Sequence, residues 1–164
     1  TNLVTLSRLD EEDPFPVRTE FSLSDVLWEI SEPFVSLAQA KGKTYTQDIA
    51  DGLTVTGDRT AIQQMISILL DNALKYSPDG GSISLTARRS GKKAEITVSN
   101  TTDGVRNIDA ARLFDRFYRA DESHSNAVSG TGIGLSIAKA TAEAHGGKIS
   151  AKQTGNTITF QVTL

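Results

Sequence analysis

The chain has 164 residues, of which 38% are hydrophobic and 23% are charged, and its formal net charge at pH 7 is −3. This composition is typical of one globular domain with a full hydrophobic core, and it excludes an intrinsically disordered chain. The negative net charge gives no support to binding of nucleic acid or of a membrane surface, and the absence of cysteine excludes disulfides and thiolate chemistry.

The start of the chain differs from the rest. Apolar residues at helical spacing predict a short helix, which an acidic run and then Pro14 and Pro16 end. A helix this short is marginal alone, so we expect it to belong to a larger unit. We therefore expect residues 1–13 to be the end of a helix of a preceding domain, and residues 14–164 to form the domain itself. Neither a signal peptide nor an apolar run long enough to span a bilayer is present in the sequence.

The hydrophobic pattern predicts the remaining elements in chain order. They are a strand at 17–21, a helix that Ser22 caps and Gly42 ends, strands at 44–49 and 53–56, a helix at 60–76, strands at 82–89 and 95–100, a helix at 135–145, and strands at 148–153 and 157–164. This order is not a regular strand–helix alternation. It predicts an α/β two-layer sandwich in which a mixed, mostly antiparallel sheet packs against about three helices.

Three polar residues share one face of the helix at 60–76. Asn72, Lys75 and Tyr76 lie at positions i, i+3 and i+4, which brings an amide oxygen, a cation and an aromatic ring together. An amide oxygen suits a hard cation such as Mg²⁺, and a lysine one turn away can neutralise phosphate charge. On these residues alone, a solvated polar face with an extended lysine remains the simpler interpretation.

A glycine run opens the helix at 135–145. Gly130, Gly132 and Gly134 allow backbone N–H groups to approach phosphate oxygens closely, and a helix N-terminus adds free donors. A flexible turn is the alternative interpretation. Because no predicted strand precedes the glycines, the pattern does not indicate a dinucleotide-binding fold.

The segment at 101–129 carries little periodicity, and a loop of this length in a compact domain is usually functional or mobile. Phe114, Phe117 and Tyr118 can anchor it on the core, while Arg116 and Arg119 point out. One interpretation is a minor hydrophobic cluster under a loop. The other is a lid that closes over a nucleotide and offers arginine to its phosphates.

Together these motifs resemble bacterial sensor histidine kinases. Residues 72–78 (NALKYSP) are similar to their N box, residues 113–121 (LFDRFYRAD) to their F box, and residues 130–139 (GTGIGLSIAK) to their G2 box. The His-Gly-Gly at 145–147 matches the usual sequel. The order and spacing match over about residues 21–164, and three ordered motifs are far more specific than any one of them.

The resemblance implies the Bergerat-type ATP-binding fold of the catalytic domain, with ATP and Mg²⁺ as cofactors. Asn72 would be the Mg²⁺ ligand, Asn72, Lys75 and Arg119 the catalytic group, and residues 105–129 the ATP lid. The nucleotide-binding residues would be Asn72, Lys75, Tyr76, Asn100, Gly104, Arg119, Gly130, Thr131, Gly132, Gly134 and Leu135. Catalysis would consist mainly of positioning and charge neutralisation.

The sequence departs from the family pattern at two places. Asn100 stands where the family has an aspartate that accepts a hydrogen bond from the adenine amino group, and Thr102 stands where it has a glycine. An asparagine oxygen can accept the same bond but lacks the charge that strengthens it. Ile68, one turn before Asn72, replaces a second asparagine that many members carry. A metal site with one protein ligand, waters and phosphates would result.

The family's phosphoacceptor is a histidine followed by an acidic residue, and neither His124 nor His145 has that neighbour. His145 is most simply structural. We therefore expect a protein-histidine kinase catalytic domain that does not autophosphorylate alone, but passes the γ-phosphoryl group of ATP to a histidine on a separate phosphoacceptor domain.

The resemblance also implies partners and a location. The partners would be the protein's own dimerisation and phosphoacceptor domain and, through it, a response regulator, and the full-length protein would be a homodimer. The domain would be the cytoplasmic part of a membrane-bound sensor kinase, with no nucleic acid among its partners. The alternatives are a non-catalytic interaction module with an altered adenine site, and an ATPase of the related gyrase, chaperone and mismatch-repair type.

Overall fold

The computed structural model of the chain describes residues 18–102, 113–114 and 134–164, so the helix expected within residues 1–13 lies outside it. The described elements are β1 (Thr19–Ser22), α2 (Leu23–Ala40), β2 (Thr44–Ile49), β3 (Thr54–Gly57), α3 (Arg59–Tyr76), β4 (Ser82–Ser90), β5 (Lys93–Thr101), α4 (Gly134–Ala144), β6 (Lys148–Thr154) and β7 (Thr157–Thr163). The strands and helices predicted within this part of the chain are confirmed, and their ends agree to within two residues.

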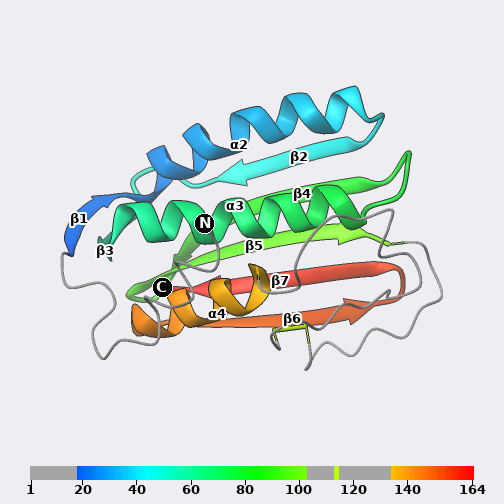
Figure 1. Cartoon of the computed structure of the whole chain (residues 1–164). Helices are drawn as coiled ribbons and strands as arrows, with labels where there is room; N and C mark the ends of the chain where they lie inside the picture. The colour runs from blue at the N-terminus through cyan, green and yellow to red at the C-terminus, as the bar shows by residue number, and fades with distance from the viewer. Residues whose placement is uncertain (1–17, 103–112, 115–133) are drawn as a thin grey trace.

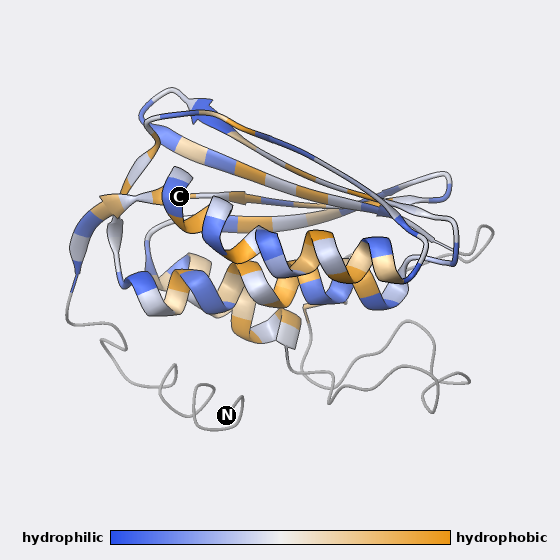
Figure 2. Ribbon diagram, turned by 90° about the horizontal axis from the view of Figure 1, so that it is seen from above, coloured by the Kyte–Doolittle hydropathy of each residue, from blue (hydrophilic) through white to orange (hydrophobic). Residues whose placement is uncertain are grey.

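The elements form two layers. Helices α2, α3 and α4 cover one face of a five-stranded sheet (Figures 1 and 2). The strand order is β2-β4-β5-β7-β6, in which β2 and β4 are parallel and all other neighbours are antiparallel. A separate antiparallel pair, β1 and β3, joins the starts of α2 and α3. The predicted α/β sandwich with a mixed, mostly antiparallel sheet is confirmed.

Side-chain caps set the starts of the two long helices. The Ser22 hydroxyl accepts a hydrogen bond from the Asp25 N–H at 3.1 Å, as the sequence predicted. The Asp58 carboxylate accepts one from the Ala61 N–H at 2.9 Å. Each cap satisfies a backbone donor that the helix itself leaves free, and therefore fixes where the helix begins.

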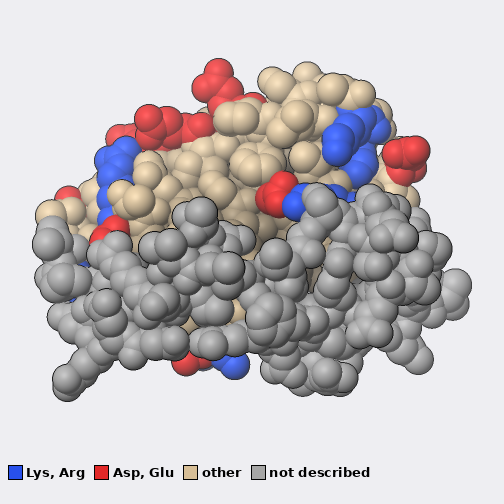
Figure 3. Space-filling view, viewed as in Figure 1, with Lys and Arg blue, Asp and Glu red and all other residues tan. Residues whose placement is uncertain are grey.

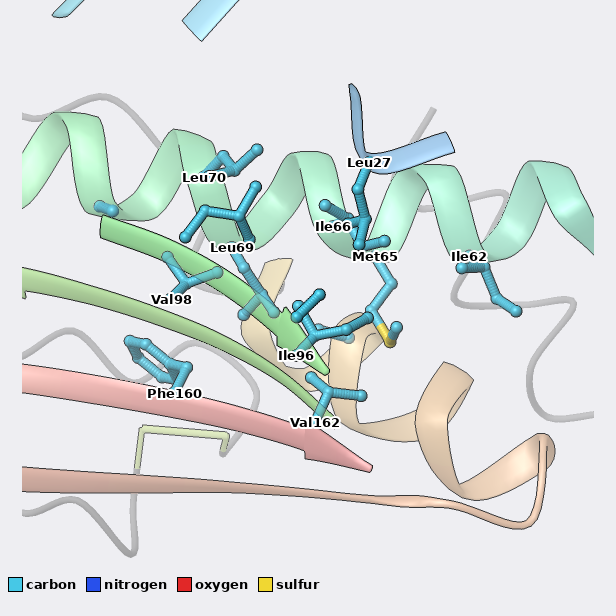
Figure 4. Packing of buried hydrophobic residues seen from close by; sticks show 14 of the residues in the cluster. Leu27, Ile62, Met65, Ile66, Leu69, Leu70, Ile96, Val98, Phe160 and Val162 are labelled. Atoms are coloured by element: carbon cyan, nitrogen blue, oxygen red, sulfur yellow. The ribbon is translucent and has the colours of Figure 1, made fainter. Parts of the chain in front are cut away.

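The core lies between α3 and the central strands. Alternate residues of β5 and β7 point to the helices, and α3 buries a stripe at helical spacing against them. Figure 4 shows this packing, which includes Ile62, Met65, Ile66, Leu69, Ile96, Val98, Phe160 and Val162. Truncation of one such buried residue to alanine costs about 2–5 kcal/mol, so the core holds α3 firmly on the sheet.

Different elements stop at the two ends of the sheet, which we call the site end and the far end. At the site end, β5 stops at Thr101 and α3 stops at Tyr76. At the far end, α3 starts at Arg59 and α4 stops at Ala144.

In the view of Figure 3, charged side chains of the described residues form small separate groups of both signs. None of the helices in the described part of the chain combines the length and the apolar character that crossing a membrane requires.

Candidate functional site

The last two turns of α3 bring together the three polar residues singled out in the sequence. Asn72, Lys75 and Tyr76 are all half-buried, at the edge of the helix layer. The Lys75 ammonium lies 2.9 Å from an Asp71 carboxylate oxygen, and these side chains are 32% and 50% exposed. An exposed ion pair at this helical spacing contributes only about 0.3–0.5 kcal/mol. A bound phosphate can therefore compete with Asp71 for the ammonium.

Asn100 occupies the end of β5 at the same end of the sheet. Its side chain points toward the helix layer, between the ladder partners Ile83 and Ile158, and the residue is 2% exposed. Its Nδ2 donates a hydrogen bond to the Thr101 carbonyl at 2.8 Å. Because a carbonyl accepts only from the amide NH₂ group, this bond assigns the orientation of the carboxamide. Oδ1 is turned away from Thr101, and among the described residues it has no hydrogen-bond donor.

The residues that follow Asn100 are tied to the neighbouring turn. The Thr102 N–H donates to the Asn156 carbonyl at 2.7 Å, and the Thr102 hydroxyl contacts the same oxygen at 3.2 Å. The Thr101 hydroxyl accepts from the Ser82 N–H at 3.0 Å. The threonine that replaces the family's glycine therefore has a partner for its hydroxyl, and the two residues that follow Asn100 are tied to the start of β4 and to the turn between β6 and β7.

Helix α4 runs antiparallel to α3 and begins near the site. At its start, a Cβ added to Gly134 would lie 3.4 Å from Cγ2 of Ile68, which is one turn before Asn72. At its end, His145 contacts Asp58 at the start of α3. The N-terminus of α4, with its positive dipole end, is therefore directed toward the site end. Leu135, in its first turn, packs against the core.

His145 is structural, as the sequence predicted. Its Nδ1 lies 2.7 Å from the Thr141 carbonyl, and its Nε2 accepts a hydrogen bond from the Asp58 N–H at 3.0 Å. These contacts specify the tautomer that carries the proton on Nδ1. Gly57 leaves room for the ring, because a Cβ there would lie 2.5 Å from the imidazole Cδ2.

The first two residues of the F box are described and anchor it on the core. Leu113 is buried, and the Phe114 ring meets the Phe160 ring edge to face, with centroids 6.0 Å apart and an interplanar angle of 81°. The Lys139 ammonium of α4 lies 5.9 Å from the Phe114 centroid. This confirms the anchoring role predicted for Phe114.

Five of the expected site residues lie outside the described part of the chain. They are Gly104, Arg119, Gly130, Thr131 and Gly132, and the same holds for residues 105–112 and 115–129 of the expected lid. Their roles stay predictions. The described members Asn72, Lys75, Tyr76, Asn100, Gly134 and Leu135 come from α3, β5 and α4, whose relevant ends lie toward the same end of the sheet.

Sequence reasoning missed one residue near the site. Lys43 follows a helix-ending glycine and precedes a strand, which is typical of an exposed loop lysine. In the structure it is 8% exposed, and its ammonium donates to carbonyls at the end of α3. No signal in the sequence indicates these contacts, because the residues involved are 31 and 34 positions apart.

Comparison with known proteins agrees with this arrangement. Residues 57–164 match the family model described as histidine kinase-, DNA gyrase B-, and HSP90-like ATPase. The chain is 40% identical to the probable sensor protein PcoS of Escherichia coli over 159 residues, which are 97% of this chain and 32% of that protein. It is 36% identical to the sensor-like histidine kinase SenX3 of Mycobacterium tuberculosis over 162 residues, 96% of this chain and 39% of that protein. The chain thus spans about a third to two fifths of the length of these relatives.

The fold has solved counterparts. The catalytic domain of histidine kinase ThkA superposes with a TM-score of 0.77 at 25% sequence identity, over 90% of this chain and 95% of that one. The chain therefore belongs to the histidine kinase-, DNA gyrase B- and HSP90-like ATPase family, and within it to the ATP-binding catalytic domains of sensor histidine kinases.

Proposed function

We propose that this domain binds ATP with Mg²⁺ and presents the γ-phosphoryl group to a histidine on the phosphoacceptor domain of its parent sensor kinase. The proposed partners are that domain and, through it, a response regulator. The parent protein is proposed to be a membrane-bound homodimer with this domain in the cytoplasm. The observation that carries the nucleotide assignment is the buried, oriented carboxamide of Asn100.

Asn100 can select adenine despite the missing charge. Adenine presents an amino group, a donor, where guanine presents a carbonyl oxygen, an acceptor. Oδ1 of Asn100 is an acceptor that faces away from Thr101, so it suits the adenine amino group and repels the guanine oxygen. A turned carboxamide would suit guanine but would place Oδ1 against the Thr101 carbonyl. The neighbouring carbonyl therefore keeps Asn100 selective for adenine.

The residues of α3 fit a magnesium–triphosphate complex. Mg²⁺ keeps several waters and is commonly held by one or two protein oxygens plus phosphate oxygens. The Asn72 amide supplies one neutral oxygen, and Lys75, which Asp71 holds only weakly, supplies a cation one turn later. When bound, the metal neutralises charge on the β- and γ-phosphates. The N-terminus of α4 offers backbone donors to the same phosphates.

The altered adenine position also suggested a non-catalytic interaction module. The structure disfavours that alternative, because the substituted residues are accommodated. Asn100 has an acceptor free to face the base, and Thr102 has a partner for its hydroxyl. The Asn100 acceptor, which has no donor among the described residues, is the atom that the adenine amino group would meet, so it does not indicate a degraded site.

The test is calorimetric titration of the domain with ATP and with GTP in Mg²⁺, alongside Asn72→Ala and a matched control, Gln63→Ala, on the same helix. We expect saturable ATP binding and no measurable GTP binding. Loss of the Asn72 oxygen should weaken ATP by about 3 kcal/mol, roughly a hundredfold, while the control stays at the wild-type affinity.

Two outcomes would count against the proposal. A folded wild-type domain that binds no ATP would favour the interaction module. Tight ATP binding with steady hydrolysis, and no transfer to a supplied phosphoacceptor domain, would favour an ATPase of the gyrase type.

A further inference from the structure

Lys43 is a buried lysine whose ammonium is held by two backbone carbonyls. It is 8% exposed, and its Nζ donates to the carbonyls of Leu74 at 2.6 Å and Ser77 at 2.7 Å. The described residues offer it no carboxylate at ion-pair distance. Lysine is almost never fully buried unless it is paired, so these two bonds compensate its burial.

The two carbonyls belong to the end of α3. A helix leaves its last carbonyls without backbone partners, and a cation at that end also meets the negative end of the helix dipole. The Ser77 hydroxyl contacts the Leu74 carbonyl as well, at 3.3 Å, and the Ser77 N–H donates to the Ala73 carbonyl at 3.1 Å. Helix α3 ends without a glycine, so the lysine takes over part of the cap.

These contacts bracket two residues of the candidate site. Lys75 and Tyr76 lie between Leu74 and Ser77, and Asn72 lies in the same final stretch of the helix. Holding the carbonyls before and after Lys75 and Tyr76 fixes the backbone that carries them. A side chain can be positioned no more precisely than this backbone.

Lys43 is itself held in place. Its own N–H donates to the Ala38 carbonyl at 2.9 Å, at the end of α2. The next residue, Thr44, starts β2 and donates its N–H to the Gly81 carbonyl at 2.9 Å. The ammonium therefore extends from a backbone that two hydrogen bonds fix, and it joins the end of α2, the start of β2 and the end of α3.

We propose that Lys43 is a positioning residue of the nucleotide site, whose ammonium fixes the last turn of α3 so that Lys75 and Tyr76 are presented to the nucleotide. This inference rests on the nucleotide-binding function proposed above. Burial lowers the pKa of Lys43, and the charge of Lys41 lowers it further, while Asp79 opposes both. A lysine at this buried place thus carries a cost that a purely apolar residue would avoid.

The test uses a variant that removes the Lys43 ammonium and keeps an unbranched apolar side chain. Lys43→Met is compared with wild type and with Lys41→Met, which removes an exposed charge two residues away. ATP in Mg²⁺ is titrated by calorimetry at a temperature where all three proteins are folded. We expect Lys43→Met to bind ATP roughly tenfold more weakly, as loss of a supporting contact behind a binding group commonly does, and Lys41→Met to bind it as wild type does.

Amide hydrogen exchange separates positioning from general stability. In Lys43→Met the amides of Lys75, Tyr76 and Ser77 should exchange faster, while those in the middle of α3 stay protected. Equal acceleration along the whole helix, or an unchanged ATP affinity in a folded variant, would overturn the proposal. If Lys43→Met does not fold, Lys43→Arg, which retains a cation and donors, is titrated instead. Affinity closer to wild type than that of Lys43→Gln is then expected, and equal affinities would overturn the proposal.

The experiment keeps the two proposals apart. Absence of ATP binding in the wild type contradicts the nucleotide-binding function. Binding by the wild type with equal binding by Lys43→Met contradicts only the role of Lys43.

Discussion

The C-terminal ends of α3 and α4 differ in how their last carbonyl groups are hydrogen-bonded. Helix α4 ends in a left-handed glycine, Gly146 (φ 75°), after which the Gly147 N–H donates back to the Ala142 carbonyl at 2.9 Å. Two exposed cations add bonds from outside, Arg18 to the Ala144 carbonyl at 2.8 Å and Lys93 to the Gly146 carbonyl at 3.3 Å.

Helix α3 has no glycine at its end. Ser77 leaves the helix in an extended conformation, with φ −76° and ψ 139°, and the buried ammonium of Lys43 satisfies two of its carbonyls. The C-terminal end of α4, which local backbone chemistry caps, lies at the far end of the sheet. The C-terminal end of α3, which a distant, buried side chain caps, lies at the site end beside Lys75 and Tyr76. The position of the last turn of α3 can therefore be changed by substitutions at residues outside the site itself.

The largest effect on stability is expected at the far end, from His145→Ala. Loss of the ring removes the acceptor of the partly buried Asp58 N–H and the contact to the Thr141 carbonyl. The free energy of unfolding in urea should fall by about 1–3 kcal/mol. ATP affinity should be unchanged under folding conditions, because the ring links the start of α3 to the end of α4, away from Asn72.

Glu143→Ala is the control for this variant. It removes an exposed side chain of the same helix, whose only ion pair in the described structure is a 3.9 Å contact with Lys139, and should shift stability by less than about 0.5 kcal/mol. Loss of ATP affinity in folded His145→Ala would remove the distinction between a structural far end and a functional site end.

The same contrast explains what could be predicted from the sequence. The end of α4 depends on the local sequence His-Gly-Gly, and the cap Ser22 accepts from the N–H of Asp25, only three residues away, so these boundaries were predicted correctly. Strand alternation in β5 and the helical stripe in α3 likewise depend on short-range spacing. The sheet order is different, because the parallel pairing of β2 with β4 joins residues 38 positions apart.

The candidate site was predictable only where a motif is compact. Asn72, Lys75 and Tyr76 lie on one helix face, and periodicity places them together. The orientation of Asn100 depends on the carbonyl of the next residue in a particular backbone conformation, and no residue pattern encodes it. The role of Lys43 depends on a contact with residues of another element, so its identity as a loop lysine was misleading.

A smaller effect is expected from Lys93→Met, which removes one of the two exposed cations at the end of α4. Its hydrogen bond to the Gly146 carbonyl is long, at 3.3 Å, and exposed to water that can replace it. Unfolding in urea should therefore shift by no more than about 0.5 kcal/mol. Lys92→Met, the adjacent turn residue, serves as the matched control. A loss clearly above that of the control would mean that α4 also depends on a cation from another element.

The smallest effect is a pH dependence at the end of α3. Burial, followed by the nearby charge of Lys41, lowers the pKa of Lys43 below its ordinary value of 10.5, and Asp79 only partly opposes this. The unfolded chain therefore binds more protons than the folded one as pH approaches 10.5, and linkage then requires stability to rise with pH. The unfolding free energy of wild type minus that of Lys43→Met should therefore increase between pH 7 and pH 10.

Both proteins contain Tyr45, whose pKa burial raises to about 12. A phenol with a raised pKa loses stability as pH rises above its unfolded value near 10, so this loss occurs equally in both proteins and cancels in the difference. The measurement is urea unfolding of each protein at matched ionic strength across the range. A difference that stays flat or falls with pH would mean that the ammonium is not desolvated at the helix end, and that the two helix ends are closer in character than their contacts indicate.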